Sequence, residues 1–564
     1  MPVFDRDDGW QAGLPPVRCK RIRVERALAV PLPDGGRLLA DRHHPADDEC
    51  APLVLMRTPY GRRGSGWLAR IIARRGYQVL VVSVAGTAGS SGRFRGWLLD
   101  AAEPGAIMDW LRTRPWFPGV MATWGASFLG YTQWQMGIEP IAEWRAALIQ
   151  DAPPEVYDTF LYRGGAFALG DWLRWAQQVR ASCGTRGDPS LLRGAAAMLP
   201  ALLHRRRAYD HLPVAEADRV LAGRPIGFFR EWARHRRPGG LWQAMDHTAN
   251  AEHLPPTVHL AGAWQDPFLP GVVSGYAALR SGEHGAQRRV RLLVGPWTHG
   301  WGLFTREYLS EAFAVLGHAL RGEGEAPRGV GLWVGGAQRW REHDAWPPPH
   351  RSEPLHLHPG GALDRRRPGA GGAPTRLRYD PADPAPSVGG PVLFGGGAKD
   401  SRALLERPDA AAFAGPELAE GVEVAGPVRA EVWVRSALAH ADVFVRVCDV
   451  EPQGAWRHVC DGIVRLEPGG PAAEDLPSGD GHLYRARVRL WPTAHRFAAG
   501  HRIGVLVTGG AHPRYERNLG TGDQSGTAMR ANDVEILHDE RHPSAVILPH
   551  SAVAGTGAEG GAGV

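Results

Sequence analysis

The hydrophobic pattern of the chain changes along its length, and this restricts the fold more than any other feature. Between residues 21 and 150, short apolar runs at 53–56, 79–84 and 120–124 alternate with turns and amphipathic segments. Runs that are apolar on both faces are typical of strands covered by helices on both sides. This part of the chain therefore predicts a mostly parallel sheet in an α/β fold.

The rest of the chain follows two other patterns. Between residues 151 and 250 the strand signals fade and tryptophans stand among helix formers, which indicates a helical insertion. Apolar runs then return at 258–261 and 290–294. Beyond residue 352, apolar and charged residues alternate, and this period of two predicts an all-β sandwich. The length of 564 residues also favours several hydrophobic cores over one.

Charge and cysteine usage exclude several classes of function. The formal net charge is +6, but the arginine clusters at 205–207 and 234–237 lack the base-reading and stacking groups of a nucleic-acid surface. The five cysteines contain no CxxC pair, which argues against a disulfide framework or a zinc knuckle. No apolar run has the length of a membrane span or resembles a signal peptide. We therefore expect a cytoplasmic protein that binds neither nucleic acid nor membrane.

The strongest local motif is Gly125-Ala-Ser-Phe-Leu-Gly130, which follows an apolar run and precedes a helical stretch. A serine on a strained turn from strand to helix projects its hydroxyl above a sheet, and small flanking residues let the strand and the helix approach closely. The motif alone is a weak signal, because ordinary glycine–serine turns look the same. Its position after a predicted strand favours Ser127 as a nucleophile.

A serine nucleophile needs a base, and the base needs an orienting acid. Asp266 and His299 each follow a predicted strand, at the ends where such sheets place their chemistry. Their order after Ser127 is that of an α/β-hydrolase. The chain holds 24 histidines, so the position after a strand is what distinguishes His299 from the others.

Several separated motifs resemble one family over nearly the whole chain. They are Arg57-Thr-Pro-Tyr-Gly-Arg62, the serine motif, Trp264-Gln-Asp266, Gly295-Pro-Trp-Thr-His299 and, farther on, Trp491-Pro-Thr-Ala-His495. In this order they resemble the CocE/NonD serine hydrolases, which carry an Xaa-Pro dipeptidyl-peptidase C-terminal domain. The resemblance implies an α/β-hydrolase domain with a helical cap insertion, followed by an all-β, jelly-roll-like sandwich.

The resemblance also implies roles for single residues. Ser127 would be the nucleophile, His299 the base and Asp266 the orienting acid. The hydroxyl of Tyr60 and the backbone N–H of Phe128 would donate hydrogen bonds to the oxyanion of the tetrahedral intermediate. Relatives usually have tyrosine where this chain has Phe128, but a backbone donor survives that change.

One segment departs from the family pattern. Relatives commonly read Asp-x-Arg-Gly where this chain has Ser83-Val-Ala85-Gly86. The joint loss of both charges is consistent with a deleted ion pair, which need not destabilise the fold. The triad is unaffected, so the expected consequence is a change of local shape beside the site.

No metal or organic cofactor is expected, because acyl transfer to serine requires neither. His356 and His358 are interpreted as two histidines on one face of a strand, without further metal ligands. The loop with Gly86, Gly89 and Gly92 misses the spacing of both nucleotide-binding fingerprints. The expected partner is a small-molecule ester or amide substrate.

Substrate selection is expected from the cap, with Trp172, Trp175 and Phe268 as candidate apolar walls, although core packing is the commoner role of a tryptophan. Residues 151–250 hold 14 arginines against 10 acids, which disfavours capture of a cationic α-amino group. We therefore favour a carboxylic ester hydrolase. A Xaa-Pro dipeptidyl-peptidase stays open, because a buried carboxylate such as Asp158 or Asp171 would bind an amine. A non-catalytic binding protein on a hydrolase scaffold is the alternative from another class.

These patterns divide the chain into five expected segments. They are 1–150 (first segment of the α/β-hydrolase domain), 151–250 (helical cap), 251–350 (second segment of the hydrolase domain), 351–551 (β-sandwich) and 552–564 (disordered tail).

Overall fold

The structure is a computed structural model that describes residues 14–180, 182–183, 187, 203–282, 284–470, 473–476 and 481–551. The expected tail at 552–564 lies outside the described residues, as does most of the helix-forming run at 191–203. Within the described ranges, none of the helices combines the length and the apolar character needed to cross a membrane.

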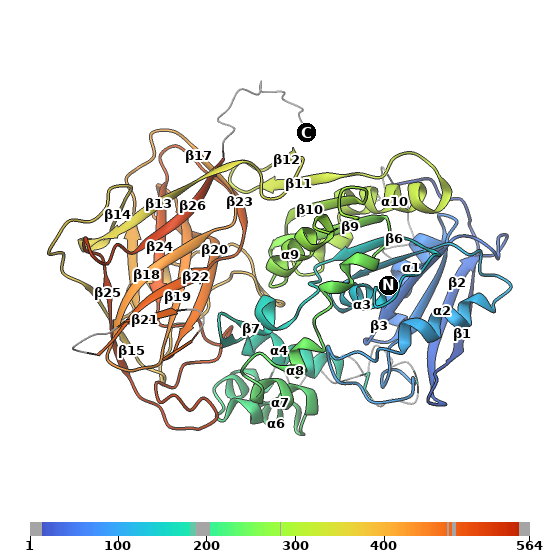
Figure 1. Ribbon diagram of the computed structural model, residues 1–564, viewed down its shortest axis with the longest axis horizontal. Coiled ribbons are helices and arrows are strands. Elements are labelled where there is room, and N and C mark those ends of the chain that lie inside the picture. Colours follow the sequence, from blue (N-terminus) through green and yellow to red (C-terminus); the bar gives the residue numbers. More distant parts are fainter. Residues whose placement is uncertain are drawn as a thin grey trace.

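A ten-stranded sheet forms the centre of the hydrolase part, on the right of Figure 1. Its strand order is β1-β2-β4-β3-β5-β6-β9-β10-β11-β12, and the pairs from β4 to β11 are parallel. The strands are β1 (Ile22–Pro31), β2 (Arg37–Pro45), β3 (Leu53–Thr58), β4 (Gln78–Ser83), β5 (Met121–Ala126), β6 (Trp144–Gln150), β9 (Thr257–Gln265), β10 (Arg289–Thr298), β11 (Gly329–Val334) and β12 (Arg339–His343).

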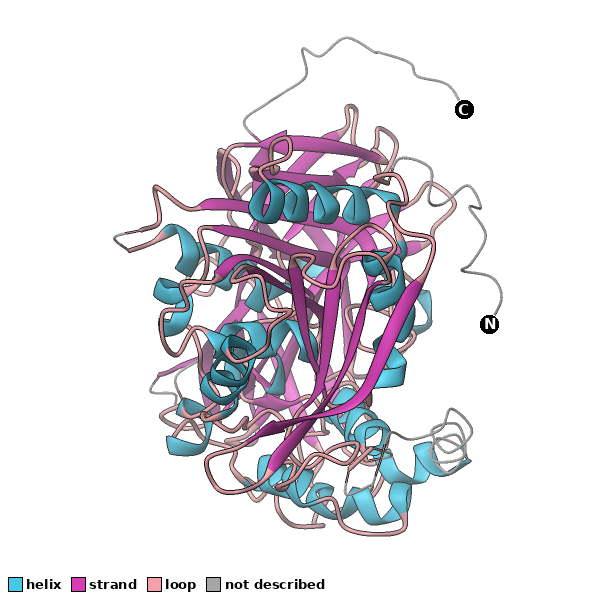
Figure 2. Ribbon diagram, turned by 90° about the vertical axis from the view of Figure 1, so that its right-hand side faces the viewer, coloured by secondary structure: helices cyan, strands magenta, loops and turns pink. Residues whose placement is uncertain are grey.

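Helices cover both faces of this sheet, as Figure 2 shows. They are α1 (Gly66–Ala73), α2 (Glu103–Arg112), α3 (Phe128–Met136), α9 (Leu269–Arg280) and α10 (Arg306–Arg321). Val54 and Met56 of β3 belong to the hydrophobic cluster with α1 and α10, whereas Leu53 and Leu55 belong to the cluster with α2, α3 and α9. Strands that bury both faces need apolar residues at every position, which explains the compact apolar runs in the sequence.

The segment between β6 and β9 is mostly helical where it is described. It contains β7 (Tyr162–Arg163), β8 (Ala166–Phe167), α4 (Leu169–Val179), α6 (Ala217–Ala222), α7 (Gly227–Arg234) and α8 (Gly240–Gln243). These helices lie between the two large parts of the molecule, at the bottom of Figure 1.

The remaining strands form the β-sandwich on the left of Figure 1. They are β13 (His350–His358), β14 (Ala362–Asp364), β15 (Thr375–Tyr379), β16 (Ala410–Ala414), β17 (Val422–Gly426), β18 (Arg429–Ser436), β19 (Ala441–Val450), β20 (Trp456–Leu466), β21 (Ala473–Leu476), β22 (His482–Arg489), β23 (Thr493–Phe497), β24 (Arg502–Thr508), β25 (Asn532–Leu537) and β26 (Ala545–Ser551). Ala430, Val432 and Val434 of β18 are buried between more exposed neighbours, as the period of two predicts. The predicted fold class, an α/β-hydrolase domain with a helical insertion followed by a β-sandwich, is confirmed.

One hydrophobic cluster, here called the shared core, joins all three parts. It contains Trp97 and Phe128 from the hydrolase part, Trp172 from the helical segment, and Phe444 and Tyr515 from the sandwich. All five side chains are buried. The hydrolase part, the helical segment and the sandwich therefore contribute side chains to one continuous core.

Candidate active site

Four neighbouring parallel strands end at the candidate site. In the order β5, β6, β9, β10, the residues that follow the strand ends are Ser127, Asp151, Asp266 and His299. The carboxyl ends of parallel strands meet along one edge of a sheet, which is where open α/β sheets place their ligands. Three of these residues were predicted from the sequence, and Asp151 was not.

Ser127 lies on a strained turn between β5 and α3. Its φ is +59° and its ψ is −128°, a conformation that non-glycine residues adopt rarely and mostly at functional sites. Its backbone N–H donates to the carbonyl oxygen of Gln150 at 2.9 Å. The residue is partly exposed.

The two glycines of the serine motif permit this turn. A Cβ added to Gly125 would lie 2.3 Å from the Cβ of Leu129, and one added to Gly130 would lie 2.5 Å from the Cβ of Ala152. Both distances are far below any contact that carbon atoms tolerate. The glycines at these positions are therefore required for the close approach of β5, α3 and the end of β6.

His299 and Asp266 form a hydrogen-bonded pair. The Nδ1 of His299 lies 2.5 Å from the Oδ2 of Asp266, and Oδ1 of the same carboxylate accepts the Phe268 N–H at 2.7 Å. Burial lowers the pKa of His299, but the charge and the hydrogen bond of Asp266 outweigh burial, so that the pKa lies above 6.5. The ring of Phe268 packs edge-on against the imidazole, with 5.1 Å between ring centroids. The pair has the geometry of a general base with its orienting acid.

The two expected oxyanion donors are the hydroxyl of Tyr60 and the backbone N–H of Phe128. Trp175 Nε1 donates to the hydroxyl oxygen of Tyr60 at 2.8 Å, and the Ser127 side chain lies close enough to this hydroxyl to act on its pKa. Burial is the main reason that the pKa of Tyr60 is raised, so its phenol keeps its proton at neutral pH and can donate. The N–H of Phe128 lies in the first turn of α3, where backbone donors have no partner within the helix.

Two buried arginines hold the loop that carries Tyr60. Arg57, at the end of β3, forms an ion pair with Glu103 of α2 and donates to the side chain of Gln135 of α3 at 2.7 Å. Arg62, two residues after Tyr60, pairs with Asp41 at 2.8 Å. The loop that carries Tyr60 is thereby anchored on both sides of this residue.

Arg62 also explains part of the departure from the family pattern. Its Nη1 donates to the hydroxyl of the buried Ser83 at 2.8 Å, and the N–H of Ala85 donates to Glu103 at 2.8 Å. Both positions are therefore hydrogen-bonded to the two ion pairs that hold the Tyr60 loop. The serine hydroxyl supplies a neutral acceptor to an arginine whose carboxylate partner is Asp41.

The three predicted pocket residues lie side by side in the shared core. Trp172, Trp175 and Phe268 are buried, with exposed fractions of 1%, 3% and 0%. The ring of Trp172 packs against the rings of the other two. Trp175 contacts Tyr60 and Phe268 contacts His299. All three thus pack as core residues, and two of them also touch the candidate catalytic groups.

The two carboxylates named as possible amine binders differ in their surroundings. Asp158 is partly exposed and paired with Arg489 of the sandwich. Asp171 is buried on α4, where Oδ1 accepts the N–H of Leu393 at 3.0 Å, and burial raises its pKa to about 6. Of the two, Asp171 is the one without an arginine partner among the described residues.

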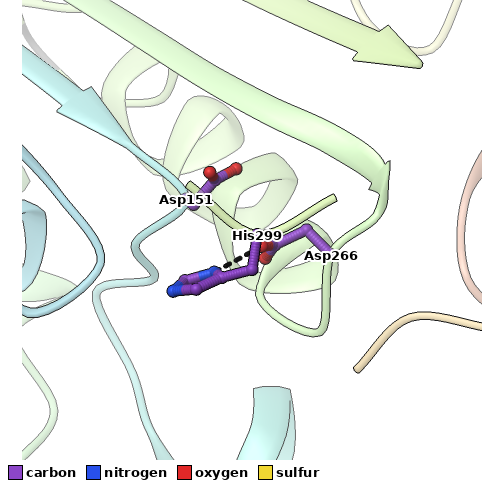
Figure 3. A group of neighbouring side chains, drawn as sticks. All are labelled: Asp151, Asp266 and His299. Carbon is purple, nitrogen blue, oxygen red and sulfur yellow. Dashed lines mark hydrogen bonds and ion pairs between the residues drawn. The ribbon is translucent and has the colours of Figure 1, made fainter. Parts of the chain in front are cut away.

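Asp151 completes a compact group with Asp266 and His299, as Figure 3 shows. Each residue offers one atom that could ligate a metal ion, a carboxylate oxygen or an imidazole nitrogen, and these three atoms lie within 4.8 Å of one another. Such a set could hold a cation, but the His299–Asp266 hydrogen bond already engages one atom of each, as an acid–base pair does. A signal for Asp151 was present in the sequence, because it follows the apolar run 146–149 as Asp266 and His299 follow theirs.

The sandwich reaches the candidate triad through Trp491. Its Nε1 donates to the backbone carbonyl of Asp266 at 3.0 Å. The guanidinium groups of Arg163 and Arg514 lie over the Trp491 ring, 4.6 Å and 4.8 Å from its centroid. Cation–π contacts of this kind restrain the ring, so the sandwich contributes to the position of the acid.

Two protein-family models match consecutive parts of the chain. The model of the X-Pro dipeptidyl-peptidase (S15 family) matches residues 34–301, and that of the X-Pro dipeptidyl-peptidase C-terminal non-catalytic domain matches residues 325–547. The cocaine esterase of Rhodococcus sp. (strain MB1 Bresler) is 29% identical over 577 residues, with 93% of this chain and 98% of the esterase covered.

Two solved structures share the fold over almost the whole chain. An aminopeptidase from a marine sediment archaeon, Thaumarchaeota archaeon, superposes with a TM-score of 0.80 at 22% identity, and the match covers 95% of this chain and 98% of that one. An α-amino acid ester hydrolase superposes with a TM-score of 0.77 at 21% identity, covering 97% and 99%. At these identities the likeness concerns the fold alone.

Proposed function

We propose that this chain, which matches the X-Pro dipeptidyl-peptidase (S15 family) model over residues 34–301 and resembles the CocE/NonD serine hydrolases, hydrolyses carboxylic esters through Ser127. The observation that carries the proposal is the His299–Asp266 hydrogen bond at the strand ends next to the strained turn of Ser127. Acyl transfer requires a serine nucleophile and an oriented histidine, and both lie at the same edge of this parallel sheet.

The proposed reaction has two steps. In the first, Ser127 Oγ attacks the ester carbonyl while His299 accepts the hydroxyl proton and then protonates the leaving alcohol. In the second, His299 removes a proton from water, which attacks the acyl-enzyme and releases the acid. Tyr60 and the N–H of Phe128 would stabilise the oxyanion in both steps, with Trp175 holding the Tyr60 oxygen in place.

An ester substrate is favoured over a Xaa-Pro amide for two reasons. The segment 151–250 has more arginines than acids, which disfavours a cationic amine. The relative that is 29% identical to this chain is named as an esterase. The peptidase alternative is supported by the family model and by the buried Asp171, a carboxylate within electrostatic reach of His299.

The first test compares a short-chain p-nitrophenyl ester with a Xaa-Pro p-nitroanilide. Ser127→Ala should lower kcat for either substrate by at least about 10⁴-fold, because the nucleophile is lost. Faster serine-dependent cleavage of the ester supports the esterase, whereas preferential release of the dipeptide moves the assignment to the peptidase.

Ser310→Ala on the surface of α10 is the matched control, since that hydroxyl bonds only locally to the carbonyl of Glu307. It should keep full activity, and thermal unfolding should be unchanged in both variants. Full activity of Ser127→Ala would refute the catalytic role of the serine. A wild-type protein that hydrolyses neither substrate would favour the non-catalytic binding protein.

We also propose the domain division and the location. β11 and β12 extend the ten-stranded sheet, which supports assigning 251–350 to the hydrolase domain, with 151–250 as its cap and 351–551 as the sandwich. All five cysteines are free thiols, which supports a reducing, cytoplasmic location.

A further inference from the structure

Asp151 is tied to the segment that carries His299. Its Oδ2 accepts the N–H of Gly300, the residue after His299, at 2.9 Å, and also accepts from the side chain of Gln150 at 3.0 Å. The residue is fully buried and has a φ of +45°, a strained conformation for a residue with a side chain. The backbone N–H of Asp151 also donates to the carbonyl oxygen of Ala261 in β9, so β6, β9 and β10 all contact this residue. Figure 3 shows its carboxyl beside the His299–Asp266 pair.

The second oxygen of Asp151 is unusual. Among the described residues, nothing hydrogen-bonds to its Oδ1, although the atom is buried. A buried carboxylate oxygen without a partner is costly, and the group lowers this cost by keeping its proton. Burial, and next the charge of Asp266, raise the pKa of Asp151 to about 8. At neutral pH Asp151 is therefore mainly protonated.

This arrangement gives Asp151 two tasks. We propose that Asp151 positions His299 through the N–H of Gly300 and serves as a second anionic partner for the His299 imidazolium when Asp266 is neutral. The inference rests on the proposed function, because it names a positioning residue for the same base. Without the charge of Asp266, Asp151 loses one of the two causes that favour its protonated form and ionises at lower pH. The resulting anion lies within 4.8 Å of the imidazole.

A purely structural role of Asp151 makes different predictions. Asp151→Asn preserves an oxygen that can accept from Gly300 and removes only the capacity for charge. Asp151→Ala removes the acceptor as well. The two variants therefore separate the charge from the positioning of the Gly300 segment.

The kinetic test is a double-mutant cycle with the p-nitrophenyl ester. Loss of the orienting acid in a serine triad lowers kcat by about 10⁴-fold. If Asp151 supplies the second anion, Asp266→Asn alone should lower kcat by only about 10²-fold. The double variant Asp266→Asn/Asp151→Asn should show the full decrease of about 10⁴-fold. Asp151→Asn alone should have a small effect, and Asp151→Ala a larger one. If Asp151→Asn lowers kcat by the same factor in the wild-type protein and in the Asp266→Asn variant, the proposal is overturned.

Asp218→Asn is the matched control, because Asp218 is also a buried acid that accepts a backbone N–H, that of Ile226, but it lies in α6 and pairs with Arg230. It measures the general effect of neutralising a buried acid. Its effect on kcat should be the same with and without Asp266→Asn, and unfolding temperatures report any loss of stability.

A second measurement is independent of turnover. In Ser127→Ala protein with ¹⁵N-labelled histidine, the pKa of His299 is followed by NMR and assigned by His299→Gln. Adding Asp151→Asn to Asp266→Asn should lower this pKa, because the last neighbouring anion of the pair is removed. An unchanged pKa overturns the role of Asp151 even if the ester is cleaved. A wild-type protein without Ser127-dependent hydrolysis refutes the proposed function instead, while the NMR result still decides the role of Asp151.

Discussion

At the scale of single residues, the acid of the candidate triad has each of its acceptors engaged. Asp266 accepts from Phe268 and His299 with its two carboxylate oxygens and from Trp491 with its backbone carbonyl. These partners come from its own turn, from the end of β10 and from the sandwich. A carboxylate held in this way stays oriented toward the imidazole, and its charge sets the pKa of His299.

This predicts the pH dependence of hydrolysis. The neutral imidazole is the active form, so kcat/KM should fall as the pH decreases through the pKa of His299. Because that pKa is raised, the midpoint of the acidic limb should lie above 6.5. Asp266→Asn should move the midpoint down, since it removes the main cause of the increase.

The measurement is a pH profile of kcat/KM between about pH 5 and 9, the range in which histidine titrates. Thermal unfolding over the same range separates titration of the site from loss of the fold. A wild-type midpoint at or below 6.5 would contradict the electrostatic coupling of His299 to Asp266.

At the scale of elements, the turn from β5 to α3 sets the direction of the nucleophile. Gly130 lets the first turn of α3 pack against Ala152, just beyond the end of β6. The same contact brings Asp151 close to Ser127 along the edge of the sheet. A change in helix position here would move Ser127 relative to His299.

Gly130→Ala tests this packing. The added Cβ would overlap the Cβ of Ala152 at 2.5 Å, so the variant should lose about 1–3 kcal/mol of unfolding free energy and much of its ester hydrolysis. Gly105→Ala is the matched control, because it lies exposed on α2 with nothing within 4 Å of the new Cβ. That change should be neutral or stabilise by up to about 1 kcal/mol. Equal stability of the two variants, measured by chemical denaturation, would show that the close approach is unnecessary.

The sequence predicted two kinds of strand. In one kind both faces are buried, and in the other apolar and charged residues alternate strictly. The strands β3, β4 and β5 stand out because they are continuously apolar. The edge strand β1 is mostly exposed and carries no comparable signal. The apolar strand β6 was missed, and with it Asp151, whose buried position depends on the parallel pairing of β6 with β9. The apolar run 146–149 is visible in the sequence, but the position of its strand between β5 and β9 is a property of the folded sheet.

The candidate site was partly predictable for the same reason. Ser127, Asp266 and His299 follow strands that the sequence reveals, and the family resemblance adds Tyr60 and Phe128. The hydrogen bond from Trp175 to Tyr60 and that from Trp491 to Asp266 join residues more than 100 positions apart. Side-chain contacts across such separations depend on how the cap and the sandwich pack.

At the scale of the whole molecule, the sandwich belongs to the architecture of the site. Trp491 bonds to Asp266, and Phe444 and Tyr515 enter the shared core beside Phe128. Arg236, between α7 and α8, pairs with Glu516, which also pairs with Arg465 of β20 at 2.6 Å. The cap is thus fixed to the sandwich by buried charges as well as by apolar packing.

Trp491→Phe tests the contribution of the sandwich. The substitution keeps an aromatic ring between Arg163 and Arg514 but removes the N–H that bonds to Asp266. We expect a loss of about 1 kcal/mol in unfolding free energy from the hydrogen bond and a decrease in kcat of about 10-fold from the displaced acid, with KM nearly unchanged.

The matched control is Trp433→Phe on β18, where the ring packs against His542 and lies near the guanidinium of Arg485, away from the triad. Its kinetic constants should equal those of the wild type. If both tryptophan variants turned over the ester at the wild-type rate, the sandwich would have no part in holding the acid.

The shared core has a consequence for protein engineering. Because the hydrolase part, the cap and the sandwich contribute side chains to one cluster, the cap is not an exchangeable module. A chimera that takes its cap from a relative must also take the sandwich residues that face it, such as Leu393 and Ile463. New substrate ranges in this scaffold are therefore best sought by coordinated substitutions across the cap and the sandwich, with both partners of each contact changed together.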